Sequence, residues 1–178
     1  MKNYSITKRL CRAGIIASLY TVLTYVFAPF AFGPFQIRPA EALCILALIY
    51  PEAIPALAVG CALSNLFSPF ALYDVSIGSL TTLLAAFVSY LVGANLKNVP
   101  LKIFVGGLPP VLFNAFVIPF VIVFLCGDSG NNTSVWIAYF SYVGSFFLTQ
   151  SVWVYALGTP LYLTVSRLKG RGLRFLNE

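Results

Sequence analysis

The sequence predicts an all-helical membrane protein, a bundle of six transmembrane helices with both termini in the cytoplasm. Of its 178 residues, 60% are hydrophobic and 9% are charged, and the mean hydropathy is +0.90. A soluble domain is about 45–50% apolar and about 25% charged, so this chain has too few charges to cover a water-facing surface. Apart from Arg38, the basic residues lie at the chain ends and in one short loop, a distribution that indicates membrane topology. The net charge of +6 therefore does not predict nucleic-acid binding.

Composition also limits the chemistry of the chain. It has no histidine, and its four cysteines (Cys11, Cys44, Cys61 and Cys126) form no C-x-x-C motif. Histidine-based catalysis and histidine-bound metals are thereby excluded, and we expect buried, inert cysteines. No Ser-Lys or paired-Asp arrangement lies at membrane depth, and no P-loop motif is present. We therefore expect a single domain over residues 1–178 that is not an enzyme and has no metal or cofactor.

The first of the six predicted helices covers residues 8–30. It begins with Lys8, Arg9 and Arg12, and its apolar run of about 20 residues is long enough to span the bilayer. No cleavage site follows, so we expect an uncleaved helix. Ala13 and Ala17 give it a small face that lets another helix approach closely.

Residues 40–67 could form one span or two short ones, because Pro51 and Pro55 interrupt them. With one span, the later basic segments would all lie outside. With two spans, over 40–50 and 53–67, these segments join the basic N-terminus inside, and Arg38 alone stays outside. The positive-inside rule favours two spans.

The remaining helices are predicted over 74–96, 101–126 and 135–167. The first has a stripe of small residues for tight packing: Gly78, Thr81, Ala85, Ser89 and Gly93. In the second, glycines and prolines over 106–110 predict irregular backbone, which survives at membrane depth only when it is covered by protein. The helix predicted over 135–167 is longer than the hydrocarbon core. Three alternatives are open: it tilts, it breaks near Gly158, or it extends into the cytoplasm.

Polar residues gather on the outer side of this topology, and three of them belong to the polar stretch 32–43. They are Gln36, Arg38, Glu41, Asn65 and Asp74.

Most of the polar residues could have a purely structural role. Arg38 and Glu41 could form an ion pair, Asp74 could cap a helix with help from Ser76, and Asn65 could end one. Asn114 could satisfy backbone groups freed by the prolines before it. Trp136, Tyr139 and Tyr142 could be an interfacial aromatic belt. For Glu52, which has no basic neighbour in its turn, we expect solvation or a partner contact.

A binding site is the alternative that unites these residues. Carboxylates, amides and aromatic faces suit a flat, nitrogen-rich ligand, because a carboxylate accepts paired N–H bonds and an aromatic ring stacks on a purine-like face. We expect ligand contacts from Gln36, Arg38, Glu41, Asn65, Asp74, Asn114, Trp136 and Tyr139, and the resemblance described next adds Gln150.

Four stretches, FGPFQIRPAEAL, NLFSPFALYDVSIGSLTTLLAA, LPPVLFNAF and YALGTPL, resemble the QueT family in order and spacing. These are substrate-binding (S) components of energy-coupling factor (ECF) transporters. The resemblance implies uptake of a 7-deazaguanine queuosine precursor, such as preQ1 or queuine, across a prokaryotic cell membrane. It places Gln36, Arg38, Glu41, Asn65, Asp74 and Asn114 at the family's polar positions, with the loop around Gln36 and Arg38 as a lid.

The resemblance also implies partners: a transmembrane coupling subunit (T component), which docks on Ala13 and Ala17, and two ATPase subunits. One position departs from the family, which commonly has Glu where this chain has Gln150. A neutral residue there weakens the case for preQ1, whose aminomethyl group is cationic, and favours a larger or less charged relative such as queuine. The rival functions are an S component for another vitamin or nucleobase, and a structural membrane subunit without a ligand.

Overall fold

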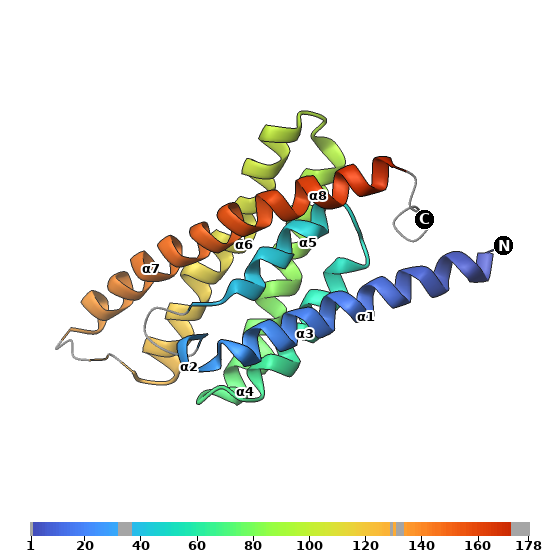
Figure 1. Ribbon diagram of the computed structural model, residues 1–178. Helices are drawn as coiled ribbons and strands as arrows, with labels where there is room; N and C mark the ends of the chain where they lie inside the picture. The colour runs from blue at the N-terminus through green and yellow to red at the C-terminus, as the bar shows by residue number, and fades with distance from the viewer. Residues whose placement is uncertain (1, 32–36, 129, 131–133, 172–178) are drawn as a thin grey trace.

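The fold is all-helical, as predicted. A computed structural model describes residues 2–31, 37–128, 130 and 134–171, and every regular element within them is a helix (Figure 1). In chain order the elements are α1 (Lys2–Val26), α2 (Ala28–Ala31), η1 (Pro39–Leu48), α3 (Ala53–Asn65), α4 (Ala71–Tyr73), η2 (Asp74–Gly78), α5 (Ser79–Asn95), α6 (Val99–Phe120), η3 (Val121–Leu125), α7 (Val135–Ser151), η4 (Val152–Leu157) and α8 (Gly158–Gly170).

The central element is η1, a ten-residue 3₁₀ helix in which every residue is buried. It contacts α1, α3, α5, α6 and α8, and its residues make up much of the main hydrophobic core. Pro39 stands at its first position, where a missing N–H costs no hydrogen bond. At about 2 Å per residue, η1 is about 20 Å long, which is less than the ~30 Å hydrocarbon core. Its neighbours bury all ten of its residues and leave only a groove over one side.

Among the described residues, two helical stretches are long and apolar enough to cross a membrane, Ala71–Asn95 and Val99–Leu125. The apolar η1 and α3 are shorter, with 10 and 13 residues. Elements α4, η2 and α5 follow one another without a gap, as do α6 with η3, and α7 with η4 and α8.

The prediction of irregular backbone in the first half of residues 101–126 is wrong. The chain is α-helical from Val99 to Phe120, with the prolines inside the helix. The glycines serve close packing instead: a Cβ on Gly106 would lie 2.3 Å from a methyl carbon of Leu48, and one on Gly107 would lie 2.8 Å from the ring of Tyr155. Neighbouring helices can therefore pack directly on this part of α6.

Irregular winding occurs elsewhere: the part of the chain that the structure describes has three π-helical segments. These are η2, η3 and η4, and each is continuous with an α-helix. π-Helical turns are rare and frequent at functional sites. A break near Gly158, one of the three alternatives for residues 135–167, is absent there: the helix continues, and only its winding changes where η4 ends at Leu157 and α8 begins at Gly158.

The small-residue stripe on α5 packs as predicted. All five of its members are buried. Ser89 donates a 2.8 Å hydrogen bond from its hydroxyl to the carbonyl of Gly106. A Cβ on Gly93 would lie 2.6 Å from the carbonyl oxygen of Leu48, so only glycine allows α5 to lie this close to η1.

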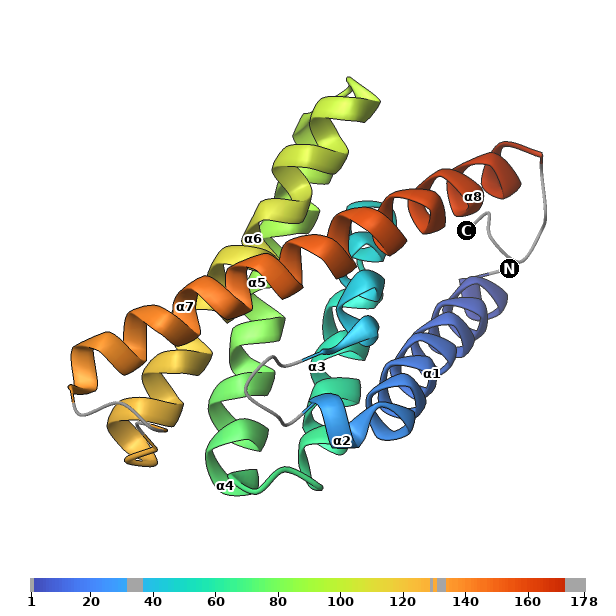
Figure 2. The same cartoon turned by 60° about the vertical axis from the view of Figure 1, so that its left-hand side comes forward.

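The amino end of α1 and the carboxyl end of α8 lie at the same end of the bundle (Figure 2). Arg12 on α1 and Lys169 on α8 both contact the ring of Tyr50, which follows η1, at 4.6 and 5.2 Å from its centroid. The basic residues of α1 and α8 are thus brought to one end.

Candidate ligand-binding site

Glu41 is the centre of a buried polar cluster between α1, η1 and α6. Its side chain is 1% exposed. The hydroxyl of Tyr20 donates to Oε1 at 2.7 Å, and the amide of Asn114 donates to Oε2 at 3.2 Å. The thiol of Cys44 also donates to Oε2, at 3.3 Å. A carboxylate can accept about four hydrogen bonds, so these three hold its position and leave it capacity for a further donor.

Local sequence explains how these groups meet. Tyr20 and Thr24 are four residues apart on α1, so they share one face of the helix. Both are 1% exposed. Gly60 on α3 lets this face come close, because a Cβ there would lie 2.9 Å from the carbonyl oxygen of Ala17 and from Cβ of Tyr20. The first turn of η1 then presents Glu41 to that face.

A second polar cluster lies where α3 ends and η2 begins. Asn65 donates from Nδ2 to the carbonyl of Asp74 at 2.9 Å, and the hydroxyl of Ser68 donates to the Asp74 carboxylate. The alternative that Asp74 caps a helix is wrong, because α4 precedes it without a gap and its carboxylate accepts from Ser68. Ser76 instead bonds the carbonyl of Leu72 at 2.6 Å. Asn65 is the last residue of α3, and its amide ties that helix to η2.

Arg38 precedes η1 and is 5% exposed. Its Nε donates to the carbonyl of Ala31 at 3.1 Å, which connects α2 to the start of η1. Gln36, the other residue expected in this segment, lies outside the described residues.

Apart from Glu52, whose Oε1 pairs with Arg12, three described polar side chains are buried and have an oxygen without a hydrogen-bond partner. These atoms are Thr24 Oγ1, Asn65 Oδ1 and Gln150 Oε1. Leaving a buried polar group unpaired costs about 1–3 kcal/mol, so such atoms need an explanation, and a ligand or water is the usual one. All three can accept a hydrogen bond, and the two amide oxygens can only accept. Gln150 is 2% exposed and lies at the end of α7, directly before η4.

Trp136 and Tyr139 belong to an aromatic cluster of α6, η3 and α7. The ring of Phe124 lies 5.5 Å from Trp136 and 5.7 Å from Tyr139. Tyr139 also donates to the carbonyl of Phe116 at 3.4 Å. Trp136 is 63% exposed, in contrast to the buried Glu41. These contacts place both aromatics in a separate cluster from the one around Glu41.

The small residues of α1 face two ways. Ala13 and Ala17 are half-buried and pack against the main core. Gly14 and Ser18, on the outward side of the same turns, are exposed.

The expectation that Glu52 is solvated or bound to a partner is wrong. Its Oε1 lies 2.6 Å from a guanidinium nitrogen of Arg12, and the two side chains are 9% and 6% exposed. The pair joins α1 to the turn before α3, at the opposite end of η1 from Glu41. This turn has no basic residue of its own, and the partner comes from 40 residues earlier in the chain.

Comparison with known proteins decides the family. The family model described as QueT transporter matches residues 10–167. The chain belongs to the QueT transporter family. A curated relative from Lactococcus lactis subsp. cremoris (strain MG1363), named "Queuosine precursor transporter QueT", is 38% identical over 71 residues. This match covers 39% of the chain and 41% of the relative. No solved structure matches the chain.

Membership of the QueT transporter family, together with the apolar helices, identifies a membrane protein. It also confirms the expectation that the chain is not an enzyme. Sequence reasoning missed several members of the polar clusters, namely Tyr20, Thr24, Cys44 and Ser68. The sequence pattern could have revealed Tyr20 and Thr24, because they continue the helix face that begins with Ala13 and Ala17.

Proposed function

We propose that this chain is the substrate-binding component of an ECF importer and that it takes up a 7-deazaguanine queuosine precursor. The observation that carries the proposal is the buried carboxylate of Glu41, which three side chains hold in place and which can accept a further hydrogen bond. Buried oxygens without a partner at Thr24, Asn65 and Gln150 add acceptors elsewhere in the bundle. The name of the Lactococcus relative supports the same class of ligand.

The chemistry of the ligand fits this site. A 7-deazaguanine carries N–H donors on adjacent positions, the ring N1–H and the 2-amino group. A carboxylate with spare acceptor capacity can take one of these donors, and amide oxygens can take others. Such a ligand would satisfy buried oxygens that otherwise remain unpaired. Because those oxygens accept hydrogen bonds, a ligand rich in donors suits them better than one rich in acceptors.

The proposed topology has six spans and cytoplasmic termini in a prokaryotic cell membrane. It follows from the positive-inside rule, since Lys97, Lys102 and the basic ends of α1 and α8 then share one side. The Glu41 cluster and the Asn65–Asp74 cluster lie nearer the outer side. The segment before η1, with Arg38, is the proposed lid over them.

Transport requires partners, because the chain has no ATP-binding motif of its own. We propose a coupling membrane subunit and two ATPase subunits. The expected docking face on α1 centres on Ala13 and Ala17. Gly14 and Ser18 extend it on the exposed side of the same helix.

A thermal-shift panel on the purified chain tests the proposal. The panel contains queuine, preQ1, guanine, riboflavin and biotin. We expect queuine or preQ1 to raise the unfolding temperature most, and riboflavin and biotin to leave it unchanged. Stabilisation by riboflavin or biotin alone would assign an S component of another specificity. No stabilisation by any compound, in a chain that unfolds cooperatively, would support a structural subunit.

A further inference from the structure

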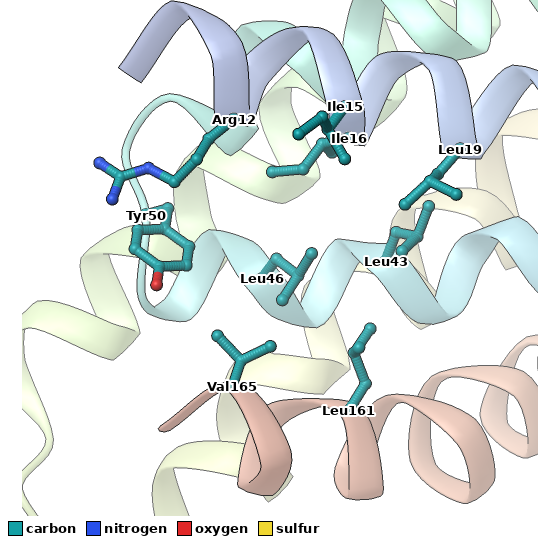
Figure 3. A pocket seen from close by; sticks show the side chains of 9 residues that line it. All are labelled: Arg12, Ile15, Ile16, Leu19, Leu43, Leu46, Tyr50, Leu161 and Val165. Atoms are coloured by element: carbon teal, nitrogen blue, oxygen red, sulfur yellow. The ribbon is translucent and has the colours of Figure 1, made fainter. Parts of the chain in front are cut away.

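An apolar groove lies outside the candidate site, between α1 and α8 (Figure 3). It has a volume of about 190 Å³, and η1 forms its floor. Ile16 and Leu19 line one wall, and Leu161 and Val165 line the other. Apart from Arg12 and Tyr50 at one end, its lining is aliphatic.

Both walls of the groove become basic at the same end. On α8, Leu161, Val165 and Lys169 are spaced four residues apart, so they follow one face of the helix. On α1, Leu19 and Ile16 are followed toward the amino end by Arg12 and then Lys8 on the same face. The helices run in opposite directions, so their basic ends coincide.

The basic end of the groove carries a net positive charge. The Arg12 guanidinium and the Lys169 ammonium both lie near the ring of Tyr50, at 4.6 and 5.2 Å from its centroid. Glu52 pairs with Arg12 and balances one of these two charges. Exposed Arg167 adds another positive charge on the last turns of α8.

We propose that this groove binds an anionic phospholipid of the surrounding bilayer. An acyl chain lies between Ile16 and Val165 over the floor of η1, and the phosphate lies at the basic end near Lys169. Burial of the chain stabilises the complex through the hydrophobic effect, at about 0.8 kcal/mol per CH₂. Basic residues at a membrane surface select anionic headgroups. The proposal is independent of which ligand the Glu41 site binds.

Native mass spectrometry of the purified full-length chain tests this site. The delipidated protein is titrated with dioleoyl phosphatidylglycerol and, separately, with dioleoyl phosphatidylcholine, which has the same chains but no net charge. We expect one phosphatidylglycerol to be retained under conditions that remove phosphatidylcholine. Val165→Trp fills the groove and abolishes this retention. Lys169→Gln keeps the groove but lowers the preference for phosphatidylglycerol by about fivefold, the effect of one basic residue at an anionic surface.

Two matched substitutions serve as controls. Leu163→Trp places the same bulk at an exposed position of α8, and Lys102→Gln removes a charge from another basic segment; both should bind lipid like the wild type. Lys169 is half-buried at the rim, so its substitution tests the site even if Val165→Trp does not fold. Wild-type lipid retention in Val165→Trp, or unchanged headgroup preference in Lys169→Gln, would overturn the proposal. The proposal would also be overturned if Val165→Trp kept the lipid but no longer co-purified with a coupling subunit. The groove would then bind protein.

Discussion

The hydroxyl of Tyr20 on α1 donates a 2.7 Å hydrogen bond to Oε1 of Glu41 on η1. Both side chains are 1% exposed. The bond joins the first helix to the central one and turns the other carboxylate oxygen toward Asn114 on α6. Three elements that are distant in sequence are thereby fixed around one buried carboxyl group.

Removing this bond should destabilise the protein. Tyr20→Phe leaves the ring in place and deletes the donor. Hydrogen bonds to charged groups contribute about 1.5–3 kcal/mol, so we expect a loss of stability of about that size and a lower unfolding temperature in detergent. Tyr25→Phe, at an exposed position on the same helix, is the control and should unfold like the wild type. Equal unfolding of Tyr20→Phe and the wild type would show that the bond contributes little.

Gln150 should determine how the site responds to ligand charge. We expect Gln150→Glu to raise the affinity for preQ1, which has a cationic aminomethyl group, about tenfold relative to preQ0, which has a neutral nitrile. The physical reason is that a charge-assisted hydrogen bond is about twice as strong as a neutral one. Competition binding with the two compounds measures the ratio. An unchanged ratio would place Gln150 away from the ligand substituent.

The native cysteines allow a test of the topology. A membrane-impermeant maleimide should label Cys126, which follows η3, in intact cells, and should label Cys11 only in inside-out vesicles. Cys44 and Cys61 are buried and should stay unlabelled in the folded protein. Labelling of Cys11 in intact cells would contradict cytoplasmic termini. Cys126→Ser identifies the labelled site.

The rate of this labelling should depend on pH. Burial raises the pKa of the Cys126 thiol, and the carboxylates of Asp74 and Asp128 raise it further. Because only the thiolate reacts, labelling should accelerate as the pH rises from 7 through 9. Asp128→Asn removes one negative charge, lowers the pKa, and should speed labelling at pH 7.5. A slower reaction in this variant would contradict the electrostatic explanation.

Gly93 should be intolerant of any side chain. Gly93→Ala places a Cβ 2.6 Å from the carbonyl oxygen of Leu48 and forces α5 away from η1. Overpacking of this kind costs about 1–3 kcal/mol, which denaturant titration would detect. Gly144→Ala on α7 is the control, because a Cβ there meets nothing within 4 Å. Equal stability of the two variants would contradict the close packing of α5 on η1.

Much of the helical organisation was readable from the sequence, because apolar runs, charge distribution and small-residue spacing are local patterns. The stripe from Gly78 to Gly93 is an example. The 3₁₀ winding of η1 was not predictable, since its apolar run does not distinguish 3₁₀ from α geometry. The regular backbone around Pro109 was also missed, because packing from neighbouring helices outweighs the local preference of proline.

The candidate site was predictable in part. Glu41, Asn65 and Asn114 stand out in an apolar chain, and the structure gives each a buried polar contact. Tyr20 does not stand out, because an aromatic residue in an apolar helix is typical of packing. The Arg12–Glu52 pair could not be inferred locally, since the fold brings together residues 40 positions apart.

Calorimetric titration of the purified chain with queuine tests most directly whether Glu41 lies in the substrate site. We predict that the wild type binds with a Kd in the micromolar range or tighter, and that Glu41→Gln weakens binding by roughly tenfold to hundredfold, the contribution of a hydrogen bond to a charged group. Glu52→Gln, the same change at the other end of η1, should lower stability but keep wild-type affinity. Absence of binding by the wild type, or equal binding by Glu41→Gln, would contradict the account.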